Sequence, residues 1–185
     1  MLKFFVIGVV VGVLLVVGGT YYYFVSGMAP VATADTPLPY EKKIASKSKN
    51  AHMRKQSLPT SPLPPDEPTL LAGAKVYKEE CASCHGLPSQ PAPGISEGMY
   101  PHSPLLFKGK GVTDDPPSET HWTVENGIRL TGMPSFKNTL TDTQLWQVTQ
   151  LLANADKLPD SVKGILAPEP TTGIPAGIHT SSVTH

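Results

Sequence analysis

The chain contains two cysteines, and both stand in one short segment, "ECASCHG" at residues 80–86. Cys81 and Cys84 are three positions apart, and His85 follows the second cysteine directly. Two thiols and one imidazole cannot complete a four-ligand metal site, so a further group must take part in whatever this cluster holds. A disulfide between the two cysteines would close a loop too small to restrict the unfolded chain much.

The sequence form C-x-x-C-H is that of covalent haem attachment. The two sulfurs add to the two vinyl groups along one porphyrin edge, and the next residue, the histidine, binds the iron from one face. A structural zinc site needs four ligands, and the chain has no other cysteine. A thioredoxin-like redox pair needs a neighbouring βαβ pattern, and none is visible in the sequence. The last alternative, an inert helix end with two chance cysteines, gives the histidine no role. The motif therefore predicts one covalently attached heme c.

Haem iron has a second axial position, and six side chains downstream of the motif are candidates for it: Met99, His102, His121, Met133, His179 and His185. We favour Met133, because the flanking Gly132 and Pro134 predict a turn that exposes its thioether. It also follows His85 by 48 residues, which is enough chain to pass round the ring. The other candidates and an open position remain alternatives, although His121 is expected at the surface. A core methionine that fills a gap fits this Gly-Met-Pro segment poorly.

Twenty prolines confine the folded part of the chain. They are concentrated in residues 30–68, 88–104 and 159–175, and proline lacks the backbone donor that regular elements need. About 90 residues, 68–158, remain for a compact body, and a body that small is marginally stable without a metal, disulfide or cofactor. Apolar spacing predicts three helices, over 68–84, over 118–130 and from a Thr141–Gln144 capping box to Pro159. No segment alternates like a strand, so we predict an all-α domain of 68–158.

Residues 4–25 carry no charge, and as a helix they would span about 33 Å, enough for the hydrocarbon core of a bilayer. We predict a transmembrane anchor over residues 1–26. The competing interpretation is a signal peptide cleaved after Ala34, because residues 32–34 have the small-x-small form of a cleavage site. The Lys and Arg side chains beyond the apolar segment outnumber Lys3, so charge does not give the orientation. The chemistry of the motif gives the orientation instead: in bacteria haem is attached on the outer side of the energy-coupling membrane, so the body is expected on that side.

The segments that flank the body have a different composition. Residues 27–67 are rich in Pro, Ser, Thr and Lys and predict a flexible linker with a root-mean-square span of roughly 35 Å. The linker is basic, whereas residues 66–160 carry seven Lys and Arg against twelve Asp and Glu, so the formal net charge of zero hides an asymmetry. A solvated linker is the plain interpretation, and attraction to anionic lipid or to an acidic partner is the alternative. Residues 159–185 predict a disordered tail.

Three segments, "GAKVYKEECASCHG", "WTVENGIRLTGMPSF" and "LTDTQLWQVTQLL", resemble class I, mitochondrial-type monohaem cytochromes c in their bacterial membrane-anchored form. The resemblance covers about residues 68–158. It implies that Cys81 and Cys84 form the thioethers and that His85 and Met133 are the axial ligands.

Further roles follow from the same resemblance. A proline carbonyl accepts the other ring hydrogen of the proximal histidine in this family, and the resemblance implies that Pro104 would take that role, although "SPLL" departs from the usual glycine-proline form. Gly73 and Tyr77 would cross the last helix near Leu145 and Trp146. Trp122 and Arg129 are candidates for contacts with the haem propionates, with ordinary packing or surface roles as the alternative.

These features predict an electron-transfer protein and not an enzyme. His/Met ligation raises the reduction potential and fills both iron positions, which leaves no site for peroxide or oxygen. We expect a tethered shuttle, or the cytochrome subunit of a respiratory or dehydrogenase complex, on the periplasmic side of a bacterial inner membrane. Its expected partners are redox proteins (an oxidase, a bc1-type complex or a quinoprotein dehydrogenase), and no nucleic acid. The alternatives are a monohaem peroxidase-like enzyme and a haem-based sensor or assembly subunit.

Overall fold

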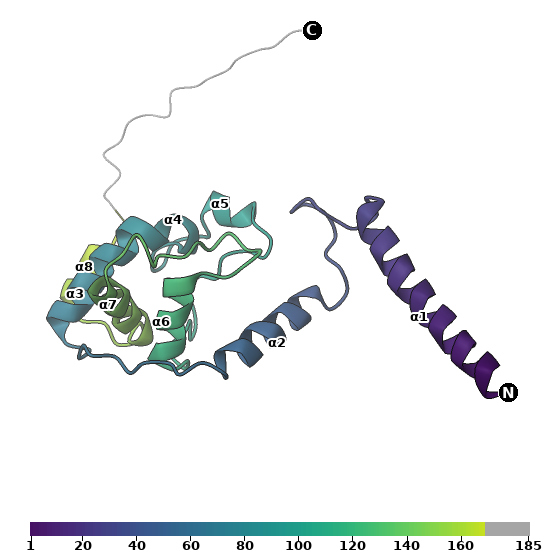
Figure 1. Ribbon diagram of the computed structural model, residues 1–185. Coiled ribbons are helices and arrows are strands. Elements are labelled where there is room, and N and C mark those ends of the chain that lie inside the picture. Colours follow the sequence, from purple (N-terminus) through teal and green to yellow (C-terminus); the bar gives the residue numbers. More distant parts are fainter. Residues whose placement is uncertain (169–185) are drawn as a thin grey trace, which may run out of the picture.

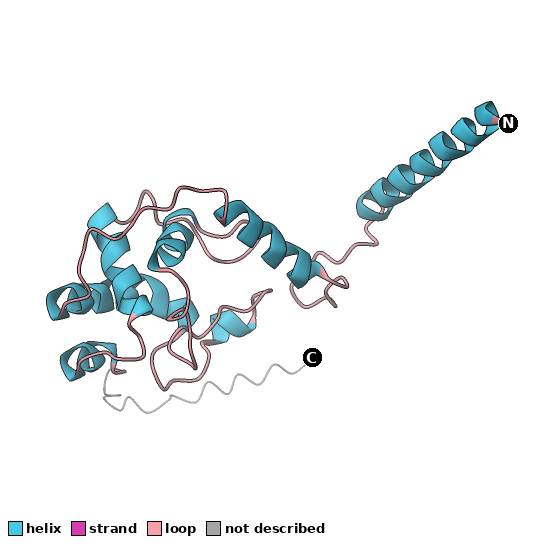
Figure 2. Cartoon of the chain, turned by 90° about the horizontal axis from the view of Figure 1, so that it is seen from below, coloured by secondary structure: helices cyan, strands magenta, loops and turns pink. Residues whose placement is uncertain are grey.

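The computed structural model describes residues 1–168, and this part of the chain is helical without any strand (Figure 2). The all-α class predicted from the sequence is therefore confirmed. The elements follow one another in the order α1 (Leu2–Val25), α2 (Glu41–Met53), α3 (Glu67–Val76), η1 (Tyr77–Cys81), α4 (Ala82–His85), α5 (Gly94–Glu97), α6 (Pro117–Asn126), α7 (Asp142–Ala153) and α8 (Asp160–Leu166).

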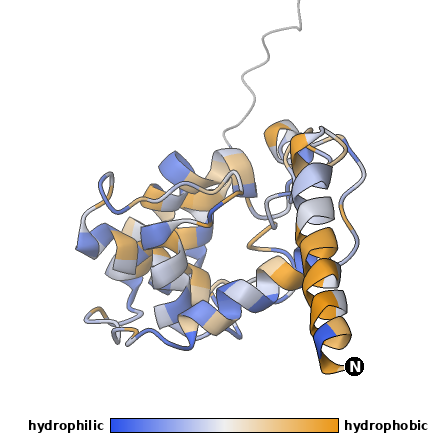
Figure 3. Cartoon of the chain, turned by 45° about the vertical axis from the view of Figure 1, so that its right-hand side comes forward, coloured by the Kyte–Doolittle hydropathy of each residue, from blue (hydrophilic) through white to orange (hydrophobic). Residues whose placement is uncertain are grey.

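Helix α1 stands apart from the body of the molecule (Figure 1). It has 24 residues, none of them buried, and a mean hydropathy of 2.5 over its most apolar stretch. Apolar residues cover most of its length (Figure 3). Length and composition thus suit it to crossing a bilayer, and it is a candidate membrane anchor.

The centre of the body is the crossing of α3 and α7, with α6 and α8 packed beside it (Figure 1). The predicted capping box begins α7: the Thr141 hydroxyl accepts from the Gln144 amide, and the Gln144 side chain accepts from the Thr141 amide. Helix α3 begins at Asp66, whose carboxylate accepts from the Thr69 amide at 3.1 Å. The two helices approach so closely at Gly73 that this residue faces the backbone of α7 at Gln147. The crossing implied by the family resemblance is present, but Gly73 meets α7 at Gln147 and Leu151 and not near Leu145 and Trp146.

The body does not end at Pro159. Residues 160–166, predicted to belong to a disordered tail, form α8, whose Val162 and Leu166 are completely buried and which packs against α3. The prediction failed because it relied on the overall richness of the segment in Pro, Gly, Thr and Ser. The missed signal was the pair Val162 and Leu166, which are four positions apart and therefore share one face of a helix. The rest of the predicted tail lies outside the described residues.

The linker predicted over 27–67 also contains a helix, α2. From Glu41 to Leu58 the chain has neither proline nor glycine, and Glu, Lys and Ala favour helix, so a helical stretch is compatible with its polarity. The linker then binds the body: the Gln150 side-chain amide donates to the Ser61 hydroxyl at 2.8 Å and to the Leu63 carbonyl at 2.7 Å. The prediction of flexibility rested on composition alone and missed both features.

His121, expected at the surface, is buried instead. Its side chain is 4% exposed and stacks on Trp146 with the ring centres 3.9 Å apart. Neither ring nitrogen has a hydrogen-bond partner, although Nε2 lies 3.7 Å from the Asp142 carboxylate. Burial lowers the pKa of His121 below its ordinary 6.5, and the charges of Glu125 and Asp142 oppose that shift only in part.

This histidine predicts a loss of stability in acid. Because its folded-state pKa is lowered, the unfolded state binds more protons, so stability is present above about pH 6.5 and falls as the pH drops below that value. We expect His121→Phe, which keeps the stack on Trp146, to flatten the fall in unfolding free energy between pH 7 and 5. Urea unfolding at each pH measures it, with the exposed His52→Gln as the control. Equal slopes for all three proteins would contradict the prediction.

Candidate haem site

The cysteine–histidine motif lies where the first long helix of the body ends. Helix α3 continues through the π-helical turn η1 into α4, and Gly86 ends the run with φ of +72°. The buried Tyr77 hydroxyl donates to the Gly86 carbonyl at 2.7 Å, and its ring packs edge-on against Phe107. Since π-helical turns shift the register of a helix, η1 decides which way the motif faces. Cys81 is buried, and Cys84 and His85 are half-buried.

The orientation of His85 is set by a residue distant in the sequence. The His85 Nδ1 atom lies 2.8 Å from the Pro104 carbonyl oxygen. A carbonyl can only accept, so Nδ1 carries the proton and donates it, which leaves the lone pair of Nε2 available to a metal. This is the contact that the resemblance implied for Pro104.

The loop that carries Met133 folds back on the end of α6. Gly127 has φ of +68°, and a Cβ there would lie 2.6 Å from the carbonyl carbon of Pro134, so only glycine fits this close approach. The Ile128 amide donates to the Met133 carbonyl at 3.3 Å, and the Met133 amide donates to the Thr131 hydroxyl at 3.1 Å. These bonds hold the Met133 side chain half-buried at the body.

One cavity of about 560 Å³ joins these elements, and its size is ordinary for a cofactor site. Five of the predicted site residues line it: Cys81, Cys84, His85, Pro104 and Met133. The alternative axial ligands Met99 and His102 line it too. The Met99 thioether accepts from the Ser103 hydroxyl at 3.4 Å, whereas His102 Nδ1 donates to the Ser96 carbonyl at 2.9 Å.

The remaining candidates lie elsewhere. Trp122 and Arg129 do not line the cavity: the Trp122 ring packs 5.6 Å from that of His52, and Arg129 is exposed. His121 is stacked in the core on Trp146. His179 and His185 fall outside the described residues.

Among the cavity side chains that sequence reasoning missed, two come from the predicted linker. Lys49 and Met53 line the cavity from α2. The available signal was their spacing of four residues in a stretch free of proline and glycine, which places both on one face of a helix.

The side chains present fit a haem group. Both thiols are free, and burial raises the pKa of the Cys81 thiol to about 12, which is unlike the thiolate of a thioredoxin-type redox pair. The imidazoles of His85 and His102 and the three methionine thioethers, of Met53, Met99 and Met133, line the same space. Its other walls include the apolar side chains of Ile95, Val112, Val124, Phe136 and Leu152. Among residues 1–168 no three His, Cys, Asp or Glu side chains are grouped so as to hold a metal ion.

Comparison with known proteins agrees with this geometry. Residues 68–152 match the family model described as cytochrome c oxidase, cbb3-type, subunit III. This match supports a c-type cytochrome. The match indicates that the cytochrome domain binds haem, and it suggests electron transfer rather than catalysis. Its limits lie close to those predicted from the sequence for the haem domain.

Two further comparisons add little to the family match. No curated protein matches the chain. Among solved structures, a chain of the reducing HAO-like protein complex of Kuenenia stuttgartiensis is similar, with 29% sequence identity and a TM-score of 0.40. The similarity covers 57% of this chain and 54% of that one, so the match spans about half the length of the neighbour.

Proposed function

We propose that this protein is a membrane-anchored monohaem c-type cytochrome that passes single electrons between redox proteins. The observation that carries the proposal is the convergence of the C-x-x-C-H motif, the Pro104 carbonyl and Met133 on one cavity. Cys81 and Cys84 would hold the haem covalently, with His85 and Met133 as the axial ligands. The bound haem supplies a one-electron couple between ferric and ferrous iron.

The protein's own groups account for the rest of this function. The Pro104 carbonyl keeps the proton on His85 Nδ1, so the other nitrogen presents the same lone pair in both oxidation states. The short hydrogen-bonded loop around Met133 restricts its thioether, and a site that does not rearrange is suited to rapid electron exchange. Two filled axial positions leave no room for a substrate, which disfavours the peroxidase alternative.

The proposed topology follows from α1 and from the chemistry of attachment. Helix α1 would hold the chain in a bacterial inner membrane by a single pass, with the cytochrome domain in the periplasm. The acidic body suggests partners with a basic docking face. Co-purification after gentle detergent extraction separates the two forms of the proposal: a stable subunit retains its complex, whereas a tethered shuttle is recovered alone.

The proposal is tested on the full-length protein, purified from membranes of a host that attaches haem. We expect one haem per chain that stays with the protein in acidified organic solvent, a low-spin spectrum in both oxidation states, and a one-electron redox titration. In Cys81→Ala/Cys84→Ala the pigment should become extractable, whereas Ser83→Ala, between the two cysteines, should retain it. A colourless wild-type protein would end the proposal, and peroxide turnover with a high-spin ferric fraction would favour the peroxidase.

A further inference from the structure

Helix α2 lies outside the segment that matches the cytochrome family, yet its last turn reaches the cavity. Met53 is 3% exposed and lines the cavity, and Lys49, one turn earlier on the same face, is half-buried there. The rest of the helix is exposed apart from Ala51, and Ile44 keeps 66% of its surface in solvent. The single buried side chain of α2 is thus the one inserted at the candidate haem site.

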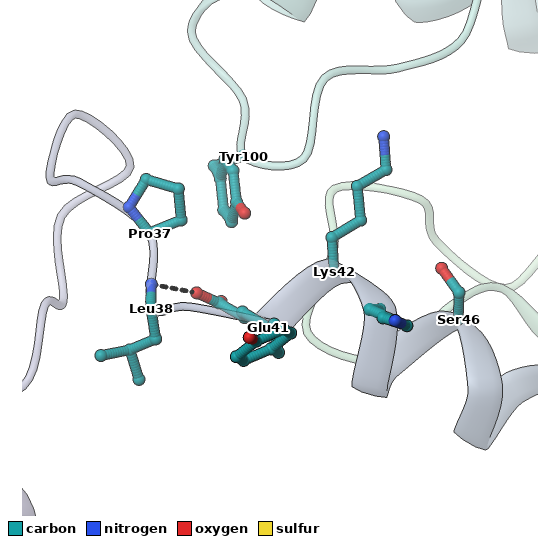
Figure 4. A pocket seen from close by; sticks show the side chains of 8 residues that line it. Pro37, Leu38, Glu41, Lys42, Ser46 and Tyr100 are labelled. Atoms are coloured by element: carbon teal, nitrogen blue, oxygen red, sulfur yellow. Dashed lines mark hydrogen bonds between the residues drawn. The ribbon is translucent and has the colours of Figure 1, made fainter.

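Contacts on both sides of Met53 hold α2 in this position. The His52 ring packs against Trp122 of α6 at 5.6 Å between ring centres. Farther along, the chain is bound to α7 by the two hydrogen bonds that Gln150 donates to Ser61 and Leu63. At its other end, the start of α2 shares an open hollow with Tyr100, which comes from the loop after α5 (Figure 4).

We propose that Met53 is a residue of the haem pocket and that α2 is one of its walls. The inference rests on the proposed function, because that function requires a haem in the cavity and Met53 is placed beside this haem. Met53 covers the cofactor and does not bind the iron. The membrane-proximal segment then does more than tether: it excludes water from one side of the redox centre.

A wall of this kind changes the redox properties of the iron. Ferric haem carries one more positive charge than ferrous haem, so water favours the ferric state and lowers the reduction potential, and an apolar cover raises it. Truncating Met53 should therefore lower the potential and admit small solutes. A side chain that only stabilised the fold would change neither property in a protein that still folds.

The test uses the full-length, haem-loaded protein in detergent. We expect Met53→Ala to lower the reduction potential and to speed oxidation of the ferrous protein by ferricyanide several-fold, because the lower potential and the wider access act in the same direction. The methionine-to-iron charge-transfer band should stay intact. Met53→Leu, which restores an apolar side chain of similar volume, should behave as the wild type, and so should Ile44→Ala on the exposed face. An unchanged potential and rate in Met53→Ala would overturn the proposal. Loss of the band in both Met53 variants would also overturn it, because Met53 would then be a ligand.

A second measurement does not depend on a variant. Arg54 and Lys55 follow Met53 directly, and Lys42 and Lys43 stand at the exposed start of α2, so trypsin can compare the two ends of one helix. In the haem-loaded wild type we expect cleavage at 54–55 to be several-fold slower than at 42–43, and equal rates would overturn the proposal. A wild-type chain that carries no covalent haem would contradict the proposed function itself. A haem-loaded chain with equal cleavage rates would contradict only the role of α2, so the two failures are distinguishable.

Discussion

Replacement of Gly73 by alanine is expected to lower the unfolding free energy of the cytochrome domain by about 3 kcal/mol. The added Cβ would lie 2.2 Å from the carbonyl oxygen of Gln147 and 3.1 Å from the Leu151 Cβ. The first contact is with backbone, which no rotamer change relieves, so α3 and α7 must move apart. Their separation would open the packing around Ala74, Val148 and Leu151, all of which are fully buried.

Thermal unfolding of the haem-loaded protein measures this effect. For a domain of this size, a loss of that magnitude lowers the Tm by roughly 12 °C or more. The matched control is Gly164→Ala in α8, where a Cβ meets nothing within 4 Å and alanine favours the helix. We expect the control to keep or slightly raise the Tm. Equal melting temperatures for the two variants would show that the α3–α7 crossing has room for a Cβ at residue 73, and would contradict the prediction.

Substitution of Met133 by alanine is expected to abolish the methionine-to-iron charge-transfer band and to lower the reduction potential by roughly a few tenths of a volt. That range lies within the ~0.8 V over which axial ligands set haem potentials. A thioether ligand favours ferrous iron, and its removal leaves the position to water or to a stronger donor. Because Met133 is only half-buried on a loop, the helical content should be retained.

Met99 provides the control for this experiment. Its thioether lines the same cavity, and a Cβ added at Gly132, next to Met133 in the chain, would lie 2.8 Å from the Met99 sulfur. We expect Met99→Leu to keep the band and the potential. If the band survives in Met133→Ala and disappears in Met99→Leu, the axial assignment passes to Met99. The fold of the domain and the proposal of covalent attachment do not depend on which methionine is the ligand.

The elements that were predicted well depend on residues close together in the chain. The Thr141–Gln144 capping box and the apolar face of α7 lie within one helix, and the C-x-x-C-H motif lies within five residues. Helices α8 and α2 were missed because the overall composition of their segments outweighed short local signals. These signals are the buried pair Val162 and Leu166, four positions apart, and a stretch from Glu41 to Leu58 without proline or glycine.

The chain itself determined the helical class, the apolar segment that is a candidate anchor and the C-x-x-C-H motif on which the proposed haem site depends. Each depends on composition or on local spacing, which act through rotamers, caps and helix periodicity over a few residues. Only the tertiary structure decided that the Gln150 side chain binds the linker at Ser61 and Leu63, that His121 enters the core, and that Met53 reaches the cavity. Those contacts join segments far apart in the chain, and their stability comes from close packing among many side chains at once.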